Sequence, residues 1–316
     1  MTSEEPLVSV ITPFYNTADY LAEAIESVLA QKYSNFECLL VNNQSRDGSR
    51  DIALKYAAKD ARIRVIDNPE FVSQVANYNG ALEHIADASK YVKFAQADDV
   101  IFPDCISKMV ELAEREPKVG IVSSYYLFGG YLDGAGIDFH VSTLPGREAC
   151  CEMLRQRRSF LGSPTTVLYR ADLVRARRPF YRDIPYMDDT EAAFEILLEH
   201  DLGFVHQILS FTRVDNESVM SVVRNFDPMK VFLYIAVEHF GRQVFSDQEF
   251  AKVHAEITDE YYRYLGKNWL RRPGERFWKF QSDALGPFNL DFEKPKAVAG
   301  AAQAVVKALT SRFRAS

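Results

Sequence analysis

Short apolar runs rich in β-forming residues alternate with segments of helical periodicity along the first half of the chain. This alternation restricts the fold most, because strands separated by helices form βαβ units. It predicts an α/β protein with three layers, in which a mostly parallel sheet lies between helices. The first strand is expected to end at Pro13, since proline has no N–H for the ladder. The predicted strands are residues 7–11, 36–41, 62–66, 91–94 and 119–122.

The second half follows a looser pattern. Residues 129–136 are rich in glycine and fit either a plain hairpin connection or a lid over an acceptor. After about residue 225 only helical patterns remain. We therefore predict an α/β domain over residues 1–222 and a helical C-terminal extension over residues 223–316. Shorter strands are predicted at 165–169, 204–205 and 209–212.

Acidic residues exceed basic residues, 44 against 37, so the formal net charge is −7. Nucleic-acid binding needs a basic surface, and no nucleic-acid partner is expected for such a chain. The four cysteines match neither a disulfide framework nor a zinc site, which favours a reducing compartment. The first residues do not resemble a signal peptide, and no apolar run is long enough to span a membrane. These features predict a cytoplasmic protein.

Two adjacent carboxylates follow the fourth predicted strand, at Asp98 and Asp99. In parallel sheets, ligands bind beyond the carboxyl ends of the strands. Adjacent carboxylates repel one another unless a cation or solvent offsets their charge, and such oxygen ligands suit Mg²⁺ or Mn²⁺. The alternative is that Asp98 caps the next helix and Asp99 is solvated.

The loops after the first and second predicted strands hold residues 12–16 and 42–49. Neither contains G-x-G-x-x-G, and the chain has no G-x-x-x-x-G-K-[ST] phosphate loop, which disfavours a dinucleotide-binding Rossmann site. Tyr15 offers a ring for stacking on a base. The amides and hydroxyls of these loops can hydrogen-bond a base edge and a ribose.

Four segments in combination resemble family 2 glycosyltransferases of the GT-A (Rossmann-like) fold, over about residues 6–220. The resemblance implies an inverting, metal-dependent enzyme with Mn²⁺ or Mg²⁺ as cofactor. It would move a sugar from a nucleotide-diphosphate sugar, by default a UDP-sugar, to the hydroxyl of a glycan or lipid-linked acceptor. Such an enzyme would serve polysaccharide, lipopolysaccharide or other glycoconjugate biosynthesis. The four segments are residues 8–16, 24–31, 36–49 and 97–104.

The resemblance also implies a nucleotide site. Pro13, Phe14 and Tyr15 would line the base. Asn43 stands where the family usually has an aspartate that accepts a hydrogen bond from the base. Asp98 would face the ribose or the metal.

For the metal and the reaction, the resemblance implies four aspartates. Asp99 would be the metal ligand, and Asp215 takes the place of a family histidine that binds metal or diphosphate. Asp189 would be the catalytic base, with Asp188 as its neighbour. A carboxylate suffices as base because the acceptor hydroxyl becomes acidic only as the new bond forms. From the residues alone, the pair could equally cap the helix that follows.

Three departures from the family pattern leave alternatives open. Asn42–Asn43 replaces an aspartate pair, Gln96 replaces a frequent aspartate, and Asp215 replaces the histidine. They favour a changed specificity and keep open a nucleotide-sugar-binding protein without transfer activity. A sugar-phosphate nucleotidyltransferase is a further rival, but it would need a Gly- and Arg-rich loop where Pro13–Tyr15 stands.

Two other segments each have two interpretations. Residues 163–166 could contact the acceptor or a phosphate, or form an ordinary turn. Residues 294–313 place apolar side chains at helical spacing among Lys and Arg. Such a helix fits peripheral contact with the inner face of a membrane, or packing on its own domain or on a partner subunit.

Overall fold

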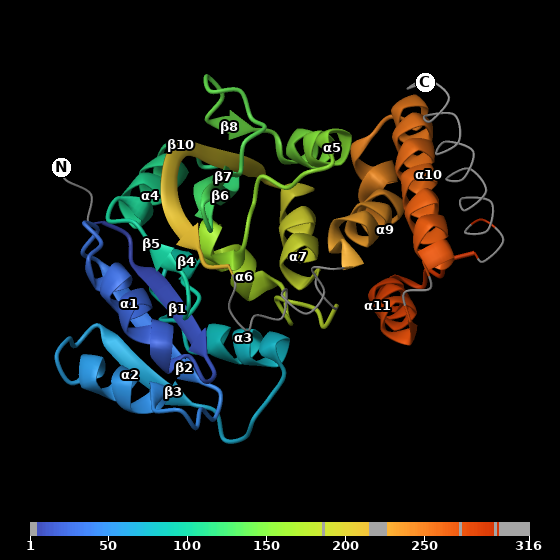
Figure 1. Cartoon of the computed structure of the whole chain (residues 1–316). Coiled ribbons are helices and arrows are strands. Elements are labelled where there is room, and N and C mark those ends of the chain that lie inside the picture. Colours follow the sequence, from blue (N-terminus) through green and yellow to red (C-terminus); the bar gives the residue numbers. More distant parts are fainter. Residues whose placement is uncertain (1–4, 185–186, 215–225, 272–273, 294–295, 297–316) are drawn as a thin grey trace. The chain divides into compact units, whose positions relative to one another are not determined.

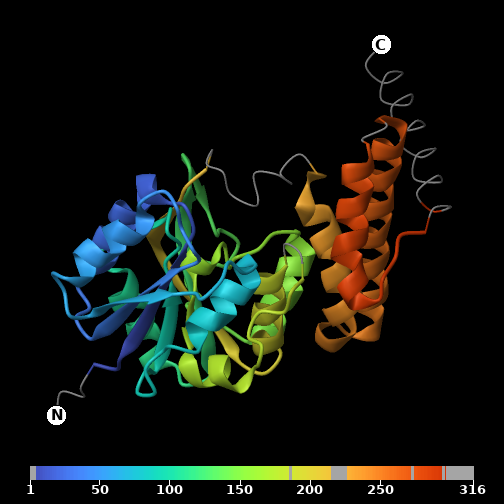
Figure 2. The same cartoon turned by 90° about the horizontal axis from the view of Figure 1, so that it is seen from below.

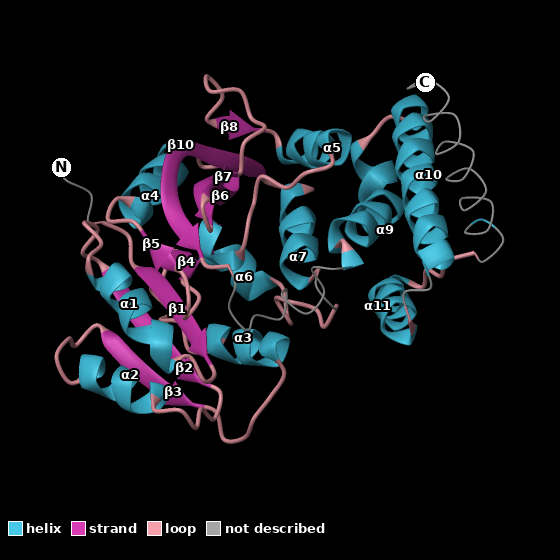
Figure 3. Ribbon diagram, in the orientation of Figure 1, coloured by secondary structure: helices cyan, strands magenta, loops and turns pink. Residues whose placement is uncertain are grey.

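One sheet organises the N-terminal part of the molecule (Figures 1 and 3). The computed structural model describes residues 5–184, 187–214, 226–271, 274–293 and 296. Among these residues the sheet has ten strands in the order β3-β2-β1-β4-β9-β6-β10-β5, with β7 paired to β6 and β8 to β10. The strands are β1 (Val8–Phe14), β2 (Phe36–Asn42), β3 (Ile63–Asp67), β4 (Tyr91–Phe94), β5 (Val100–Ile101), β6 (Val119–Phe128), β7 (Tyr131–Asp133), β8 (Thr143–Leu144), β9 (Leu168–Arg170) and β10 (Asp201–Thr212).

The long ladders of this sheet are parallel. Strand β1 pairs in parallel with β2 and β4, β2 with β3, and β6 with β10. The antiparallel ladders span only two or three residue pairs each. Because β9 runs antiparallel to both β4 and β6, the strands β1 to β4, β6 and β10 all end at one edge of the sheet. The predicted α/β class with a mostly parallel sheet is confirmed.

Helices cover both faces of the sheet (Figure 2). Helices α1, α2 and α4 pack on the face that carries Val8 and Cys38 and form the main hydrophobic core with it. Helix α3 lies on the other face, where the rings of Tyr78 and Phe94 are 5.4 Å apart. These helices and their neighbours are α1 (Ala18–Leu29), α2 (Ser49–Ala57), α3 (Gln74–Leu82), α4 (Cys105–Arg115), α6 (Ala171–Ala176) and α7 (Asp188–Leu197).

Strand β1 runs through Pro13 to Phe14, so the prediction that the strand ends at this proline is wrong. The β1–β4 ladder stops at Ile11, and beyond that residue β1 pairs only with β2. A strand segment that is paired on one side tolerates a residue without an N–H.

Two other expectations change. The structure has the single strand β10 where two short strands were predicted. The pairing of β10 with β6 is irregular between Val205 and Ile208, and this irregularity interrupts the alternation of side chains along the strand. The predicted strand at 165–169 is divided into a 3₁₀ turn, η1 (Pro164–Thr166), and β9. Residues 129–136 include the turn of the β6–β7 hairpin.

Residues 150–157, 184–187 and 217–316 form a second compact unit, whereas residues 1–149, 158–183 and 188–216 form the first. The expected domain boundary after residue 222 lies outside the described residues. Helix α5 begins in the first unit and ends in the second. The described helical elements that lie wholly or partly in the second unit are α5 (Gly146–Gln156), α9 (Pro228–Val244), α10 (Asp247–Arg271), α11 (Glu275–Leu285) and the 3₁₀ turn η3 (Gly286–Phe288).

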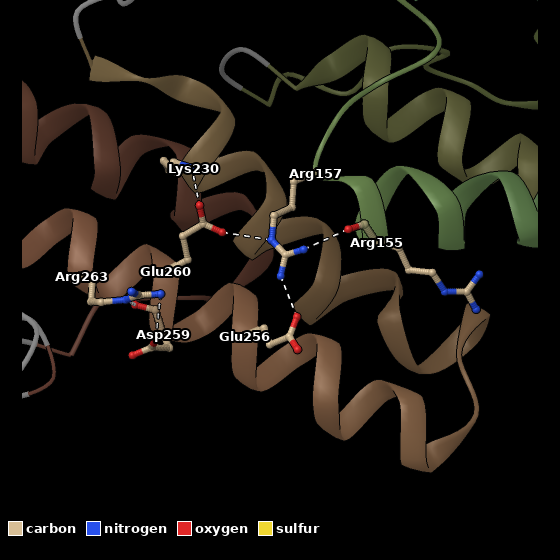
Figure 4. A network of polar contacts seen from close by, with 7 residues as sticks. All are labelled: Arg155, Arg157, Lys230, Glu256, Asp259, Glu260 and Arg263. Carbon is tan, nitrogen blue, oxygen red and sulfur yellow. Dashed lines mark hydrogen bonds and ion pairs between the residues drawn. The ribbon is translucent and has the colours of Figure 1, made fainter. Parts of the chain in front are cut away.

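Ion pairs connect segments of the second unit that are far apart in the sequence (Figure 4). The guanidinium of Arg157, just after α5, donates to Glu256 at 2.8 Å and to Glu260 at 3.1 Å, both on α10. Lys230 of α9 donates to Glu260 at 2.6 Å. Arg157 therefore helps to hold α5 and α10 together within the second unit. In the part of the chain that the structure describes, we find no helix with the length and apolar character of a membrane span.

Candidate active site

Polar and charged residues gather at the edge where the parallel strands end. Asp98 and Asp99 follow β4, and Arg213 follows β10. The turn η1 precedes β9, which starts at this edge because β9 is antiparallel to β4. Loops beyond the carboxyl ends of parallel strands are where such sheets bind ligands.

Asp99 is buried at this edge, with 3% of its surface exposed. Its carboxylate accepts hydrogen bonds from the Arg213 backbone N–H at 3.1 Å and from the Thr212 hydroxyl at 3.5 Å. Burial, and then repulsion from Asp98, raises the pKa of Asp99 to about 7. The following helix α4 has Asp104 at its N-cap position, so Asp98 is not the cap. The alternative, in which Asp98 caps α4 and Asp99 is solvated, is therefore excluded.

The side chain of Arg213 spans the Asp98–Asp99 turn. Its Nε donates to the Asp98 carbonyl at 3.0 Å, and its terminal nitrogen donates to Glu23 at 2.6 Å. The guanidinium also lies 4.8 Å from the centre of the Tyr20 ring. Arg213 therefore ties the end of β10 to the carboxylate turn and to α1.

A fully buried lysine supports the same turn. Lys93, in the middle of β4, donates to the Val167 carbonyl at 3.2 Å and also to the Thr165 carbonyl. The Thr165 hydroxyl accepts from the Gln96 N–H at 3.1 Å and bonds to Asp99. Burial lowers the pKa of Lys93. Within residues 163–166, Thr165 thus belongs to the carboxylate site, and the segment also forms the turn η1.

The donor set suits a shared metal site. No group of three or more His, Cys, Asp or Glu side chains in the described ranges is placed to hold a metal ion by itself. Asp98 and Asp99 remain as adjacent oxygen donors, and Mg²⁺ or Mn²⁺ in nucleotide sites commonly uses one or two carboxylates and completes its shell with phosphates and water. The two aspartates fit that arrangement. The other expected ligand, Asp215, lies outside the described residues.

Asp188 and Asp189 form the first turn of α7, and both are half-buried. One oxygen of Asp189 accepts from the Thr190 N–H at 2.6 Å and from the Thr190 hydroxyl at 3.2 Å. Burial raises the pKa of both carboxyls, and in Asp188 the charge of Asp189 adds to the effect. Asp189 therefore does bond to the start of its own helix, which is compatible with a second role as a base.

Tyr78 links the two aspartate pairs. Its buried hydroxyl accepts hydrogen bonds from Gln96 at 2.8 Å and from Gln74 at 2.9 Å. Burial raises the pKa of Tyr78, and the carboxylates of both Asp188 and Asp98 raise it further. The same hydroxyl therefore lies within electrostatic reach of one aspartate from each pair.

The residues that were expected to line the base differ in their exposure to solvent. Pro13 and Phe14 are buried, and Phe14 belongs to the hydrophobic core. Tyr15 is 43% exposed, and its ring lies 4.8 Å from that of Phe71, which is 60% exposed. An exposed aromatic pair at a strand end is a platform on which a flat base can stack.

Asn43 is buried and bonds to other residues of the protein. Its amide pairs with the backbone of Val72, and its oxygen also accepts from Asn68 at 3.1 Å. The amide therefore holds the loop that carries Phe71.

Sequence reasoning missed Lys93, Tyr78, Phe71 and Arg213. One signal was available for Lys93, since a lysine inside a strand that is buried on both faces needs an internal partner. For the other three, the contacts that matter join segments far apart in the chain.

The profile of the family described as "Glycosyl transferase family 2" matches residues 9–174, just over half of the chain. The chain belongs to glycosyl transferase family 2. The matched stretch of this family 2 chain includes β1 from its second residue on, β4 and both aspartates of the carboxylate turn.

Curated relatives match part of the chain. TuaG of Bacillus subtilis (strain 168), by name a teichuronic acid biosynthesis glycosyltransferase, is 37% identical over 143 residues, which are 44% of this chain and 53% of TuaG. Glycosyltransferase GlyG of Streptococcus pneumoniae serotype 4 is 28% identical over 150 residues, 47% of each chain. The chain thus spans about half the length of the curated relatives it matches.

Solved structures match over more of the chain. S. aureus TarS 1–349 in complex with UDP-GlcNAc has a TM-score of 0.64 at 16% identity, covering 89% of this chain and 80% of TarS. Mannosyltransferase PcManGT from Pyrobaculum calidifontis, in complex with GDP-Man and Mn²⁺, has a TM-score of 0.58 at 18% identity, covering 99% and 83%. These likenesses confirm the GT-A fold of the family 2 chain.

Proposed function

We propose that this family 2 chain is an inverting, metal-dependent glycosyltransferase that uses a nucleotide-diphosphate sugar. The observation that carries the proposal is that one aspartate of each pair, Asp98 and Asp188, lies within electrostatic reach of the Tyr78 hydroxyl. One pair suits the diphosphate end of a donor, and the other suits the acceptor hydroxyl.

Asp98 and Asp99 would hold a divalent cation together with the donor diphosphate. When bound, the cation stabilises the negative charge that grows on the leaving diphosphate. Arg213 and Lys93 hold the carboxylate turn from either side through the contacts described above. The exposed rings of Tyr15 and Phe71 would stack on the base of the donor nucleotide. We take a UDP-sugar as the default donor.

Asp189 would accept the proton of the acceptor hydroxyl. As the acceptor oxygen bonds to the anomeric carbon, the bond from that carbon to the diphosphate oxygen breaks, and the nucleoside diphosphate leaves. A single displacement of this kind inverts the anomeric centre. The raised pKa of Asp189 makes this carboxylate a better base than an ordinary aspartate. The acceptor would be a glycan or a lipid-linked sugar in polysaccharide, lipopolysaccharide or other glycoconjugate biosynthesis, at a cytoplasmic location.

A thermal-shift panel of UDP-glucose, UDP-GlcNAc and GDP-mannose, with and without Mn²⁺, tests the donor. A donor that binds the folded state raises the apparent melting temperature by mass action, and we expect this only with the cation. Proton NMR of the sugar released by slow donor hydrolysis then reports the anomer, which should be inverted. Cation-dependent binding without any turnover would instead favour a nucleotide-sugar-binding protein. Absence of binding by every donor would overturn both.

A further inference from the structure

One face of the β6–β7 hairpin carries a row of aromatic side chains. Tyr126 pairs with Asp133 across the hairpin, and Phe128 pairs with Tyr131. Side chains alternate between the two faces of a strand, and directly opposed residues share a face. Tyr126, Phe128 and Tyr131 therefore lie on one face together with Asp133.

The row runs from the interior to the solvent. Tyr126 is 7% exposed, Phe128 38% and Tyr131 80%. Beside the buried end, Asp133 accepts from Arg158 at 3.3 Å in an ion pair that solvent reaches. The surface thus combines flat rings, phenol hydroxyls and one charged pair.

The inner end of the row lies within electrostatic reach of Asp189. The Asp189 carboxylate is close enough to Tyr126 to interact with it electrostatically. Two glycines fix the Tyr126 ring, since a Cβ at Gly134 would lie 3.3 Å from it and a Cβ at Gly162 would lie 2.8 Å from it. Both glycines have positive φ, of 83° and 67°, which side chains rarely adopt.

The turn of the hairpin is anchored at the same edge of the sheet. The Gly129 N–H donates to the Thr212 carbonyl at 3.0 Å. A Cβ at Gly129 would lie 2.5 Å from Val214, so only glycine lets the turn approach the end of β10 this closely. The row is therefore held in place at both ends.

From this arrangement we infer that the row Tyr126–Phe128–Tyr131 is the acceptor subsite and that it binds a glycan chain. The inference rests on the proposed function, because the row leads toward the carboxylate that would take the acceptor's proton. Sugar rings present apolar C–H faces to aromatic rings and hydroxyls to polar groups, and this face offers both. The leucine pair Leu127 and Leu132 lies on the opposite face, so the row itself does not provide the aliphatic surface that a lipid tail would need.

Binding of glycans labelled with a fluorophore at the reducing end tests the subsite without turnover. The probes are maltotetraose, chitotetraose and mannotetraose, and the readout is fluorescence polarisation with the full chain. We expect Tyr131→Ala to weaken binding about tenfold, which corresponds to about 1.4 kcal/mol, because it removes the aromatic contact with the sugar. Tyr131→Phe should bind as the wild type does, because it keeps the ring. Leu132→Ala is the matched control, because Leu132 is 55% exposed on the same hairpin but on the other face.

Equal binding by Tyr131→Ala and the wild type, or binding of none of the three glycans by the wild type, would overturn the inference. Binding to vesicles that carry a polyprenyl phosphate, lost in Leu132→Ala and kept in Tyr131→Ala, would assign the hairpin to a lipid instead. Hydrolysis of the donor in Mn²⁺ without acceptor is measured in parallel. It should be unchanged in Leu132→Ala, and its absence from the wild type would count against the proposed function and not against the glycan subsite.

Discussion

Asn43 and Val72 exchange two hydrogen bonds, as two peptide groups do in a sheet. The Val72 N–H donates to Asn43 Oδ1 at 3.0 Å, and Asn43 Nδ2 donates to the Val72 carbonyl at 2.9 Å. Only an amide can both donate and accept in this way, whereas a carboxylate only accepts. This gives a structural reason for asparagine where the family usually has aspartate, and it makes base recognition by Asn43 a secondary role at most.

Replacement of this amide tests its structural role. Asn43→Asp places a carboxylate oxygen against the Val72 carbonyl in a buried position, and we expect the free energy of unfolding to fall by about 1–3 kcal/mol. Donor affinity should fall as well, because the loop with Phe71 loses its anchor. Urea unfolding and donor titration measure the two effects. Asn16→Asp is the control, since Asn16 is exposed and its side chain uses the oxygen, as acceptor from the Arg46 N–H. A fully stable Asn43→Asp chain with stronger donor binding would restore the role of Asn43 at the base.

Asp99 should make the folded protein more stable at acidic than at alkaline pH. Folded Asp99 keeps its proton up to about pH 7, whereas an unfolded aspartate loses it near pH 4. The folded state therefore binds the additional proton between these values, and its stability falls as the pH rises through this window.

Removing that carboxylate should separate stability from metal binding. Asp99→Asn should raise the free energy of unfolding at pH 8 by on the order of 2 kcal/mol, and change it little at pH 4. It should also remove the Mn²⁺-dependent binding of the donor. Melting temperature across pH and donor titration with and without Mn²⁺ check both parts, with the exposed Asp87→Asn as control. Unchanged donor affinity in Mn²⁺ would remove Asp99 as the ligand.

Asp189→Asn should leave donor binding within about twofold and lower the transfer rate by about 10²–10⁴, because general-base catalysis contributes that much. In the wild type, the rate should fall on acidification and begin to fall well above pH 4, since a base must be ionised and the pKa of Asp189 is raised. Asp188→Asn separates the two carboxyls. It leaves the Asp189 carboxylate in place, so the transfer reaction should be retained. Full turnover by Asp189→Asn would place the base elsewhere.

Gly162 should resist substitution for two separate reasons. Its φ is +67°, and an added Cβ would lie 2.5 Å from the Thr166 hydroxyl as well as against Tyr126. We expect Gly162→Ala to cost about 2–4 kcal/mol, from backbone strain of about 1 kcal/mol and overpacking of about 1–3 kcal/mol. Gly48→Ala isolates the strain, because Gly48 has φ +93° and open space around its Cα. Equal melting temperatures for the two variants would mean that the contact with Thr166 and Tyr126 relaxes without cost.

The order of strands and helices could be predicted because it depends on local patterns. The predicted strand at 91–94 matches β4, and helix α1 follows the periodicity that starts at Leu21. The register of β10 could not be predicted, since its irregular pairing depends on the neighbouring strand β6. Likewise, nothing in the motif around Asp99 indicates whether its carboxylate is solvated or buried.

The sequence by itself determined the fold class and the family of this chain, because strand and helix periodicities and the motif residues are written within short stretches. Only the tertiary structure decided how the site is built. Asn43 and its partner Val72 are 29 positions apart, and the Tyr78 hydroxyl is within electrostatic reach of Asp98, which follows β4, and of Asp188 in α7. Whether a carboxylate is buried, and which hydroxyl or amide lies beside it, depends on the packing of distant segments, and that packing also sets its pKa.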